Sequence, residues 1–195
     1  MKYLNQLEYP HIPYPTDVSN PDSKFVNMSI KEAGCGLCSL AMMVEHLTTK
    51  TISLKRLISL SIKNKANLTP GTNLKILGPI VADMFNLDFK TTNSVKTAMR
   101  HLQNGGSVIA NVGGDREGYT GVFSHGGHYI FLLSADKDSI CILDPSYKEG
   151  KYEEEGRQGK VRVDAPFVYC APEVLAQDTD NRNPGFYLFA RKKPE

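Results

Sequence analysis

The sequence lacks the features that would assign the chain to a membrane or to nucleic acid. No apolar stretch is long enough to span a bilayer, and residues 1–8 contain no apolar core of the kind found in a signal peptide. No block of basic residues occurs, and the net charge is only +2. We therefore expect a soluble, cytoplasmic chain with no membrane partner and no nucleic-acid partner.

Cysteine is also scarce, with four residues in a chain of 195, which excludes a dense disulfide framework and predicts free thiols. Internal repeats, linkers and low-complexity segments are absent. Because 41% of the residues are hydrophobic, enough apolar surface is present for a core, and we expect a single domain over residues 1–195. The oligomeric state is left open by the sequence.

The pattern of apolar residues divides the chain into three parts. Residues 1–32 contain several prolines and are predicted to be an extended lead-in, with a short edge strand near residues 12–14. Residues 33–104 are predicted to be helical, and residues 105–195 to form an antiparallel sheet. Because the helices precede the strands, the pattern favours an α+β fold. The expected helices cover residues 35–47, 54–62, 73–85 and 94–102, and the expected strands cover 107–112, 127–134, 139–144 and 185–190.

The remaining segments are predicted to be irregular. Residues 113–121 are rich in glycine, which permits a mobile flap. Residues 146–165 are polar and are expected to form a long loop. The longest charged run, residues 151–157, mixes both signs and is expected to be solvated. Residues 172–177 are predicted to form one or two helical turns.

A cysteine between two glycines begins the first predicted helix, in the sequence Gly34-Cys35-Gly36. The free backbone N–H groups at a helix N-terminus carry partial positive charge, which stabilises a thiolate and lowers the pKa of a cysteine. Cys35 is therefore a candidate nucleophile. A nucleophile of this kind needs a base from elsewhere in the chain.

One of the five histidines is placed to act as that base. His128 begins a predicted strand, and Asp144 ends the strand that returns from it. Opposed side chains of an antiparallel pair are about 5 Å apart at Cβ, so Asp144 can reach and orient the His128 ring. The spacing alone is equally consistent with Asp144 as the first residue of an Asp-Pro turn. A structural role is favoured for His11, His46 and His101, and His125 flanks the pair Gly126-Gly127 together with His128.

Three other functions remain open for these residues. Cys35 and Cys38 form a C-x-x-C pattern, as in redox proteins, but no strand leads into it. A structural zinc site would need Cys141 and Cys170 as well, and the second C-x-x-C of such a site is missing. We therefore expect Cys38, Cys141 and Cys170 to pack as small hydrophobic residues, and we expect no metal and no cofactor. The third possibility is a binding module that retains the fold without activity.

The sequence resembles the family-39-type cysteine peptidases, in their stand-alone, peptidase-like branch, which belongs to the papain-like superfamily. The similar motifs are Gly34-Cys35-Gly36 followed by residues 39–42, residues 127–130 around His128, and the pair Asp144-Pro145 one strand later. The segment 12–14 followed by residues 20–25 is similar to an upstream glutamine motif of the family. The resemblance covers about residues 9–190.

The resemblance implies an α+β, papain-like fold and a Cys-His-Asp triad. Cys35 would be the nucleophile, His128 the general base and acid, and Asp144 the orienting residue. Asn20 stands where the family has an oxyanion glutamine, and Leu37 stands where proline is common. The best-known relatives cut after the double-glycine leaders of secreted peptides, as part of an export transporter. No transporter part is visible here, so we do not carry that substrate over.

The sequence thus predicts a cysteine peptidase that hydrolyses a peptide or isopeptide amide through a thioester acyl-enzyme, and its expected partner is a peptide or protein substrate. Two alternatives stay open. One is acyl or peptidyl transfer on the same triad, and the other is a weakly active peptide-binding module with a degenerate oxyanion hole.

Overall fold

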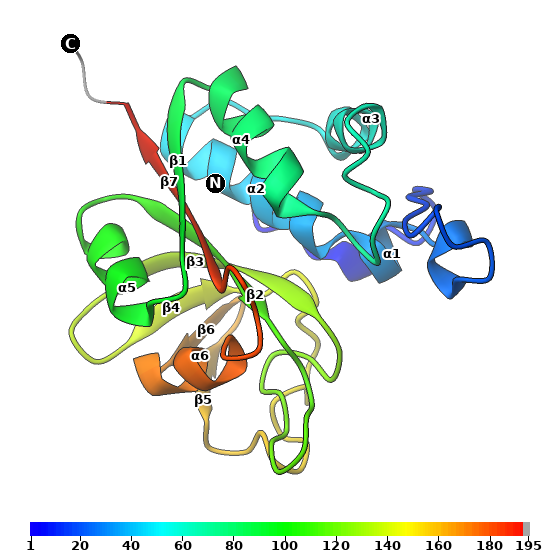
Figure 1. The fold of residues 1–195 in the computed structure, drawn as a ribbon. Coiled ribbons are helices and arrows are strands. Elements are labelled where there is room, and N and C mark those ends of the chain that lie inside the picture. Colours follow the sequence, from blue (N-terminus) through cyan, green and yellow to red (C-terminus); the bar gives the residue numbers. More distant parts are fainter. Residues whose placement is uncertain (193–195) are drawn as a thin grey trace.

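The computed structural model describes residues 1–192 (Figure 1). Residues 193–195, the end of the predicted single domain, lie outside the described residues. The α-helices are α1 (Ile30–Ala33), α2 (Cys35–Thr48), α3 (Leu54–Lys63), α4 (Leu74–Met84), α5 (Val95–Gln103) and α6 (Pro172–Asp178). Two short 3₁₀ turns, η1 (Gln6–Glu8) and η2 (Lys24–Asn27), lie in the lead-in.

The described strands form one seven-stranded sheet with the order β1-β7-β2-β3-β4-β6-β5. Every neighbouring pair is antiparallel. Figure 1 shows β7 running beside β1, although the other five strands lie between them in the sequence. The strands are β1 (Leu87–Thr92), β2 (Ser107–Val112), β3 (His128–Ala135), β4 (Ile140–Leu143), β5 (Val161–Asp164), β6 (Phe167–Cys170) and β7 (Phe186–Arg191).

The long helices begin at polar caps that are visible in the sequence. The side chains of Ser53, Asn73 and Ser94 each accept a hydrogen bond from a backbone N–H in the first turn of α3, α4 and α5. The helix α2 has no side-chain cap and instead follows Gly34. Glycine fits at this position because a Cβ atom there would lie 2.5 Å from the Ile30 carbonyl oxygen. These local signals explain why the four predicted helices agree with the structure.

The helices cover both faces of the sheet. Alternate residues of β2 and β3 face opposite sides, so Ile109 and Phe131 pack in the same cluster as α2, α3 and α4, whereas Ala110 and Ile130 pack with α5 and α6. The helix α2 is central: eleven of its fourteen residues are buried. Its N-terminus, and with it Cys35, is therefore held firmly against the sheet.

The fold class was predicted from the sequence, but three strands were missed. The strand β1 lies inside the part expected to be helical, β5 begins within the expected loop of residues 146–165, and β6 follows it. Both β1 and β5 are edge strands, and most residues of β5 are exposed, so neither shows a strong apolar pattern.

The lead-in also differs from the extended segment that was expected. It contains η1, η2 and α1, and the predicted edge strand at residues 12–14 is only a single bridge between Pro13 and Ser29. Within residues 1–192, no helix is both long enough and apolar enough to cross a membrane.

Candidate active site

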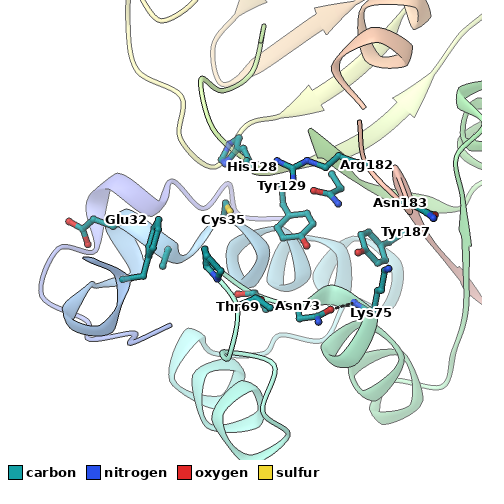
Figure 2. Close-up of a pocket in the computed structure, with 17 residues that line it drawn as sticks. Glu32, Cys35, Thr69, Asn73, Lys75, His128, Tyr129, Arg182, Asn183 and Tyr187 are labelled. Atoms are coloured by element: carbon teal, nitrogen blue, oxygen red, sulfur yellow. Dashed lines mark hydrogen bonds between the residues drawn. The ribbon is translucent and has the colours of Figure 1, made fainter. Parts of the chain in front are cut away.

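The thiol of Cys35 lies at the first residue of α2 and is 9% exposed. The backbone N–H groups of Gly36, in the same helix, and Tyr129, in β3, lie near its sulfur. The His128 side chain lies beside the same sulfur (Figure 2). The N-terminus of α2 therefore supplies the cysteine, and the sheet supplies the histidine.

The ring of His128 is buried at the start of β3, between Cys35 and Asp144. Its Nε2 atom lies 2.7 Å from Oδ1 of Asp144 and 3.0 Å from Oγ of Ser146. Because the carboxylate occupies Nε2, the other ring nitrogen remains for the thiol. The structure thus brings together Cys35, His128 and Asp144, three of the four site residues that the sequence indicated.

Electrostatics favour charge separation between the thiol and the imidazole. Burial alone would raise the pKa of Cys35, but the hydrogen bond and charge of His128 and the two backbone N–H donors lower it below its ordinary value of 9.0. Burial alone would lower the pKa of His128, but the charge and hydrogen bond of Asp144, with the contribution of Cys35, raise it above 6.5. These opposite shifts stabilise a thiolate–imidazolium pair.

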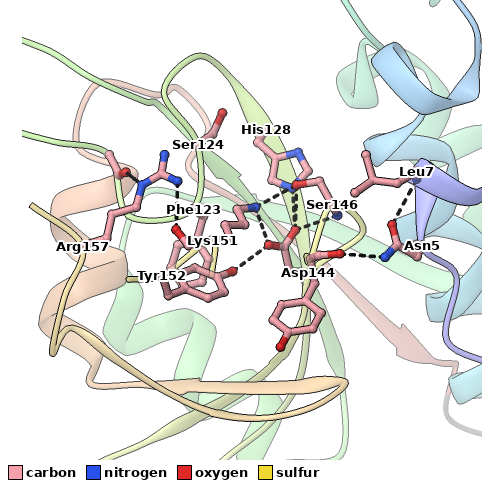
Figure 3. Close-up of polar contacts among 12 residues, drawn as sticks. Asn5, Leu7, Phe123, Ser124, His128, Asp144, Ser146, Lys151, Tyr152 and Arg157 are labelled. Carbon is pink, nitrogen blue, oxygen red and sulfur yellow. Dashed lines mark hydrogen bonds and ion pairs between the residues drawn. The ribbon is translucent and has the colours of Figure 1, made fainter. Parts of the chain in front are cut away.

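Asp144 is completely buried and accepts hydrogen bonds from several groups besides His128 (Figure 3). The Lys151 ammonium lies 2.5 Å from Oδ2, the Tyr152 hydroxyl donates to the same oxygen at 2.6 Å, and the Ser146 backbone N–H donates to Oδ1 at 2.9 Å. Burial would raise the pKa of Asp144, but the charges of Lys151 and His128 hold it far below its ordinary value of 3.8. The carboxyl group is therefore ionised.

Lys151, Tyr152 and Arg157 correct the prediction that residues 151–157 are a solvated run. All three side chains are buried, and Arg157 donates to the carbonyl oxygen of Gly121 at 2.8 Å. A run of mixed charges normally faces water, and only the aromatic Tyr152 within it indicated otherwise. Sequence reasoning therefore missed Lys151, Tyr152 and Ser146 as neighbours of Asp144.

The sulfur and the imidazole face a cleft with a volume of about 460 Å³ (Figure 2). One wall comes from the start of α2 and the loop before α4, and the other comes from β2, β3 and the segment before β7. Gly36 lets the start of α2 pack closely against both walls, because a Cβ atom there would lie 3.1 Å from Thr72 and from Tyr129. The lining includes Glu32, Cys35, Thr72, Lys75, Asn111, His128, Tyr129, Arg182, Asn183 and Tyr187.

Asn20, the fourth predicted site residue, does not line this cleft. Its side chain is exposed, and its backbone N–H bonds to the Asp17 carbonyl oxygen at 2.9 Å in a turn. The structure therefore does not bring Asn20 together with Cys35. The resemblance to the family's glutamine motif was the only basis for assigning Asn20 an oxyanion role.

The glycine-rich segment of residues 113–121 is held by several contacts. The buried carboxylate of Asp178 accepts the Tyr119 hydroxyl at 2.7 Å and the backbone N–H groups of Val122 and Phe123 at 2.8 and 3.0 Å. Arg116 donates to the Gln177 carbonyl oxygen at 2.7 Å. Opening of this segment as a flap would require these hydrogen bonds to break.

The remaining cysteines are free thiols, as predicted; Cys38 and Cys170 are buried, whereas Cys141 is only partly buried. Cys38 is fully buried in α2, Cys141 lies in β4 and Cys170 in β6. Burial raises the pKa of Cys38, opposite to the shift at Cys35. Among residues 1–192, no group of three or more histidine, cysteine or acidic side chains is arranged to hold a metal ion.

Helices packed on an antiparallel sheet, with a cysteine at the start of the central helix, define a papain-like, α+β peptidase fold. The model of the Peptidase_C39 like family matches residues 1–162, and the chain belongs to this family.

Two solved structures share the fold. One is a protein from Bacillus anthracis described as a C39-like peptidase, which is 15% identical over the whole of both chains with a TM-score of 0.59. The other is the peptidase domain of Streptococcus ComA, a bifunctional ABC transporter of a quorum-sensing pathway. It is 16% identical over 82% of this chain and 93% of that domain, with a TM-score of 0.51. No curated protein matches the chain.

Proposed function

We propose that this protein is a cysteine peptidase that hydrolyses an amide bond of a peptide or protein substrate through Cys35, His128 and Asp144. The observation on which the proposal depends is the arrangement of the three side chains at the wall of an open cleft: Cys35 lies beside His128 (Figure 2), and His128 bonds to Asp144 at 2.7 Å. Membership in a family of C39-like peptidases supports the same conclusion.

In the first half of the reaction, His128 holds the proton taken from Cys35, and the thiolate attacks the carbonyl carbon of the scissile amide. A C–S bond forms while the carbonyl oxygen becomes an oxyanion. Collapse of this intermediate breaks the C–N bond, and the imidazolium gives its proton to the leaving amine. The product is a thioester on Cys35 and a released amine.

In the second half, water replaces the amine. The now neutral His128 takes a proton from water, the hydroxide oxygen attacks the thioester carbon, and the C–S bond breaks to release a carboxylic acid. The Cys35 sulfur leaves as a thiolate, and His128 is again the imidazolium beside it. Throughout both halves, Asp144 accepts a hydrogen bond from Nε2 and keeps the ring oriented toward the sulfur.

The oxyanion needs hydrogen-bond donors, and the backbone N–H of Cys35 is one candidate. It belongs to the first turn of α2, where backbone N–H groups have no partner within the helix. In our proposal this N–H and the partial positive charge of the helix N-terminus stabilise the developing charge. Asn20 has no role in this proposed mechanism, because its side chain does not line the cleft.

The proposal is tested by incubating the protein with a library of peptides of mixed sequence and identifying products by mass spectrometry. We expect cleavage by the wild type, no cleavage by Cys35→Ala, and unchanged cleavage by the matched Cys141→Ala variant. Products that are lengthened by an added amine would indicate acyl transfer instead of hydrolysis. Equal cleavage by wild type and Cys35→Ala would contradict the proposal.

A further inference from the structure

The charged residues that line the cleft are predominantly cationic. Besides the Cys35–His128 pair, the lining contains Lys75, Arg182 and a single acidic residue, Glu32. The Glu32 carboxylate is already used: it accepts the Ser29 backbone N–H at 2.8 Å and the Ser29 hydroxyl at 2.5 Å in a capping box of α1. Figure 2 shows this carboxylate directed away from Cys35. The cleft therefore lacks a protein carboxylate to balance its cations.

Arg182 has no acidic partner in the described part of the chain. One guanidinium nitrogen, Nη2, donates to the Gly113 carbonyl oxygen at 3.0 Å, and no ion pair involves the side chain. The Nε atom is buried without a hydrogen-bond partner. A guanidinium has five N–H donors in a rigid fork that matches a carboxylate, so most of its donors are unused here.

The guanidinium of Arg182 lies close to the predicted catalytic residues. A Cβ atom on Gly127, the residue before His128, would lie 2.6 Å from Nη2 of Arg182. The absence of a side chain at position 127 leaves room for the guanidinium beside the start of β3. Figure 2 shows the guanidinium directed toward His128 and beside Tyr129, on the wall of the cleft that faces Cys35.

We propose that Arg182 binds a carboxylate of the substrate, so that the cleft prefers peptides with an acidic side chain or a free C-terminal carboxylate close to the scissile bond. The inference rests on the proposed peptidase function and adds a substrate class to it. The bound carboxylate supplies the acceptor atoms that the described residues do not provide. A charge-assisted hydrogen bond of this type changes affinity by about 10- to 100-fold.

The chain offers a matched control for this residue. Arg116 also donates from Nη2 to a single carbonyl oxygen, that of Gln177, and it also has a buried nitrogen without a partner, Nη1. Arg116 does not line the cleft. Replacing Arg116 therefore removes a comparable structural contact without changing the charge of the proposed substrate site.

The first experiment compares alkylation of Cys35 by iodoacetate, which is anionic, and iodoacetamide, which is neutral and similar in size. The quantity compared is the rate with iodoacetate divided by the rate with iodoacetamide. We expect this ratio to fall several-fold in Arg182→Gln, to be largely retained in Arg182→Lys, and to be unchanged in Arg116→Gln. Equal ratios in wild type and Arg182→Gln would overturn the inference while leaving the reactivity of Cys35 toward iodoacetamide, and so the proposed function, intact. If neither reagent labels Cys35 faster than Cys141, the proposed function fails and the inference fails with it.

The second experiment uses pairs of peptides and the wild-type protein, so it does not depend on a variant that folds. Each pair differs only by glutamate against glutamine at one position, or by a free C-terminal acid against an amide. We expect faster cleavage of the acidic member, by about 10- to 100-fold at the position that meets Arg182. The position of the effect distinguishes an acidic side chain from a chain terminus. The absence of any preference in both kinds of pair would overturn the inference.

Discussion

Asp144 accepts hydrogen bonds from Lys151, Tyr152 and Ser146 in addition to its contact with His128. A buried carboxylate is costly unless it is paired, and Lys151 provides the pairing charge. The ammonium also donates to the Ser146 hydroxyl at 2.8 Å, which itself contacts Nε2 of His128 at 3.0 Å. Lys151 therefore acts on His128 indirectly, by fixing the groups that orient the ring, and is a positioning residue.

Substitution of Asp144 should lower both catalytic activity and stability, and a second substitution at Lys151 should restore only the stability. In Asp144→Asn, peptide cleavage should fall by roughly 10⁴-fold, as in serine-protease triads with this substitution. The buried Lys151 charge would lose its partner, so the free energy of unfolding should fall by about 3–5 kcal/mol. The double variant Asp144→Asn/Lys151→Met should regain most of the stability and none of the activity. These values are measured by denaturant unfolding and by cleavage of the best library peptide.

Two outcomes would contradict this account of the pair. Recovery of cleavage in the double variant would mean that Asp144 acts on Lys151 and not on His128. A fully stable Asp144→Asn single variant would mean that the Lys151 charge needs no partner. Lys148→Met is the matched control, because Lys148 lies in the same loop with its side chain exposed, and it should change neither quantity.

Two loops next to the site are joined by the exposed side chain of His125. Its Nδ1 atom lies 2.8 Å from Asp115 and its Nε2 atom 2.8 Å from Glu154, and Glu154 also pairs with Arg157 at 2.8 Å. Both ring nitrogens must carry protons to donate to both carboxylates. The hydrogen bonds to Glu154 and Asp115 accordingly raise the pKa of His125 above 6.5. One of the two loops ends at His128, and the other contains Lys151.

Protonation of His125 should therefore stabilise these loops. Because the folded pKa is raised, the stabilisation is complete at pH values below 6.5 and is lost as the pH rises through the folded value. We expect the amides of residues 113–127 to exchange with deuterium more slowly at a pH between 4.5 and 6.5 than at a higher pH, after correction for intrinsic rates. His125→Gln should abolish this difference. Its matched control, His11→Gln, changes an exposed histidine of the lead-in.

The opposite result would be a loop that exchanges equally at both pH values in the wild type. In that case the bridge between Asp115 and Glu154 would make no contribution in solution, as is common for exposed ion pairs. Retention of the pH effect in His125→Gln would assign it to another group, such as Asp115 or Glu154, whose own pKa values are lowered by hydrogen bonds.

Across the whole molecule, the predicted triad is assembled from two distant parts of the chain. Cys35 comes from the central helix, whereas His128 begins β3 and Asp144 directly follows β4, in the sheet that this helix packs against. The cleft lies where the helical part meets the sheet, so both parts contribute walls. Folding must therefore place α2 against β3 before the site can exist.

Much of this arrangement could be predicted, because its signals are local. The apolar positions after Cys35 predict a buried helix, and the polar caps Ser53, Asn73 and Ser94 predict where later helices begin. The hairpin is similarly local: a short turn near Asp136 joins β3 to β4 and brings Asp144 opposite the start of β3. The positions of Cys35, His128 and Asp144 follow from these elements.

The features that escaped prediction depend on contacts between distant residues. The strands β1 and β5 lie at the two edges of the sheet, and β1 is ordered by pairing with β7, nearly a hundred residues later. Lys151 is buried because Asp144 provides its counter-charge. The composition of the segment around Lys151 gives no sign of this pairing. Arg182 reaches the cleft through the turn before β7, whereas Asn20, expected there from a motif, lies in an exposed turn.

The central claim is that Cys35 is a thiolate stabilised by His128, and the most direct test is the pH dependence of its alkylation by iodoacetamide. Each cysteine is followed by mass spectrometry in wild type and His128→Gln, with Cys141 as an internal reference. Because the pKa of Cys35 is lowered, its rate in the wild type should reach half of its plateau below pH 9.0, and this midpoint should rise in His128→Gln. A wild-type midpoint at or above pH 9.0, or a midpoint that His128→Gln leaves unchanged, would contradict the account.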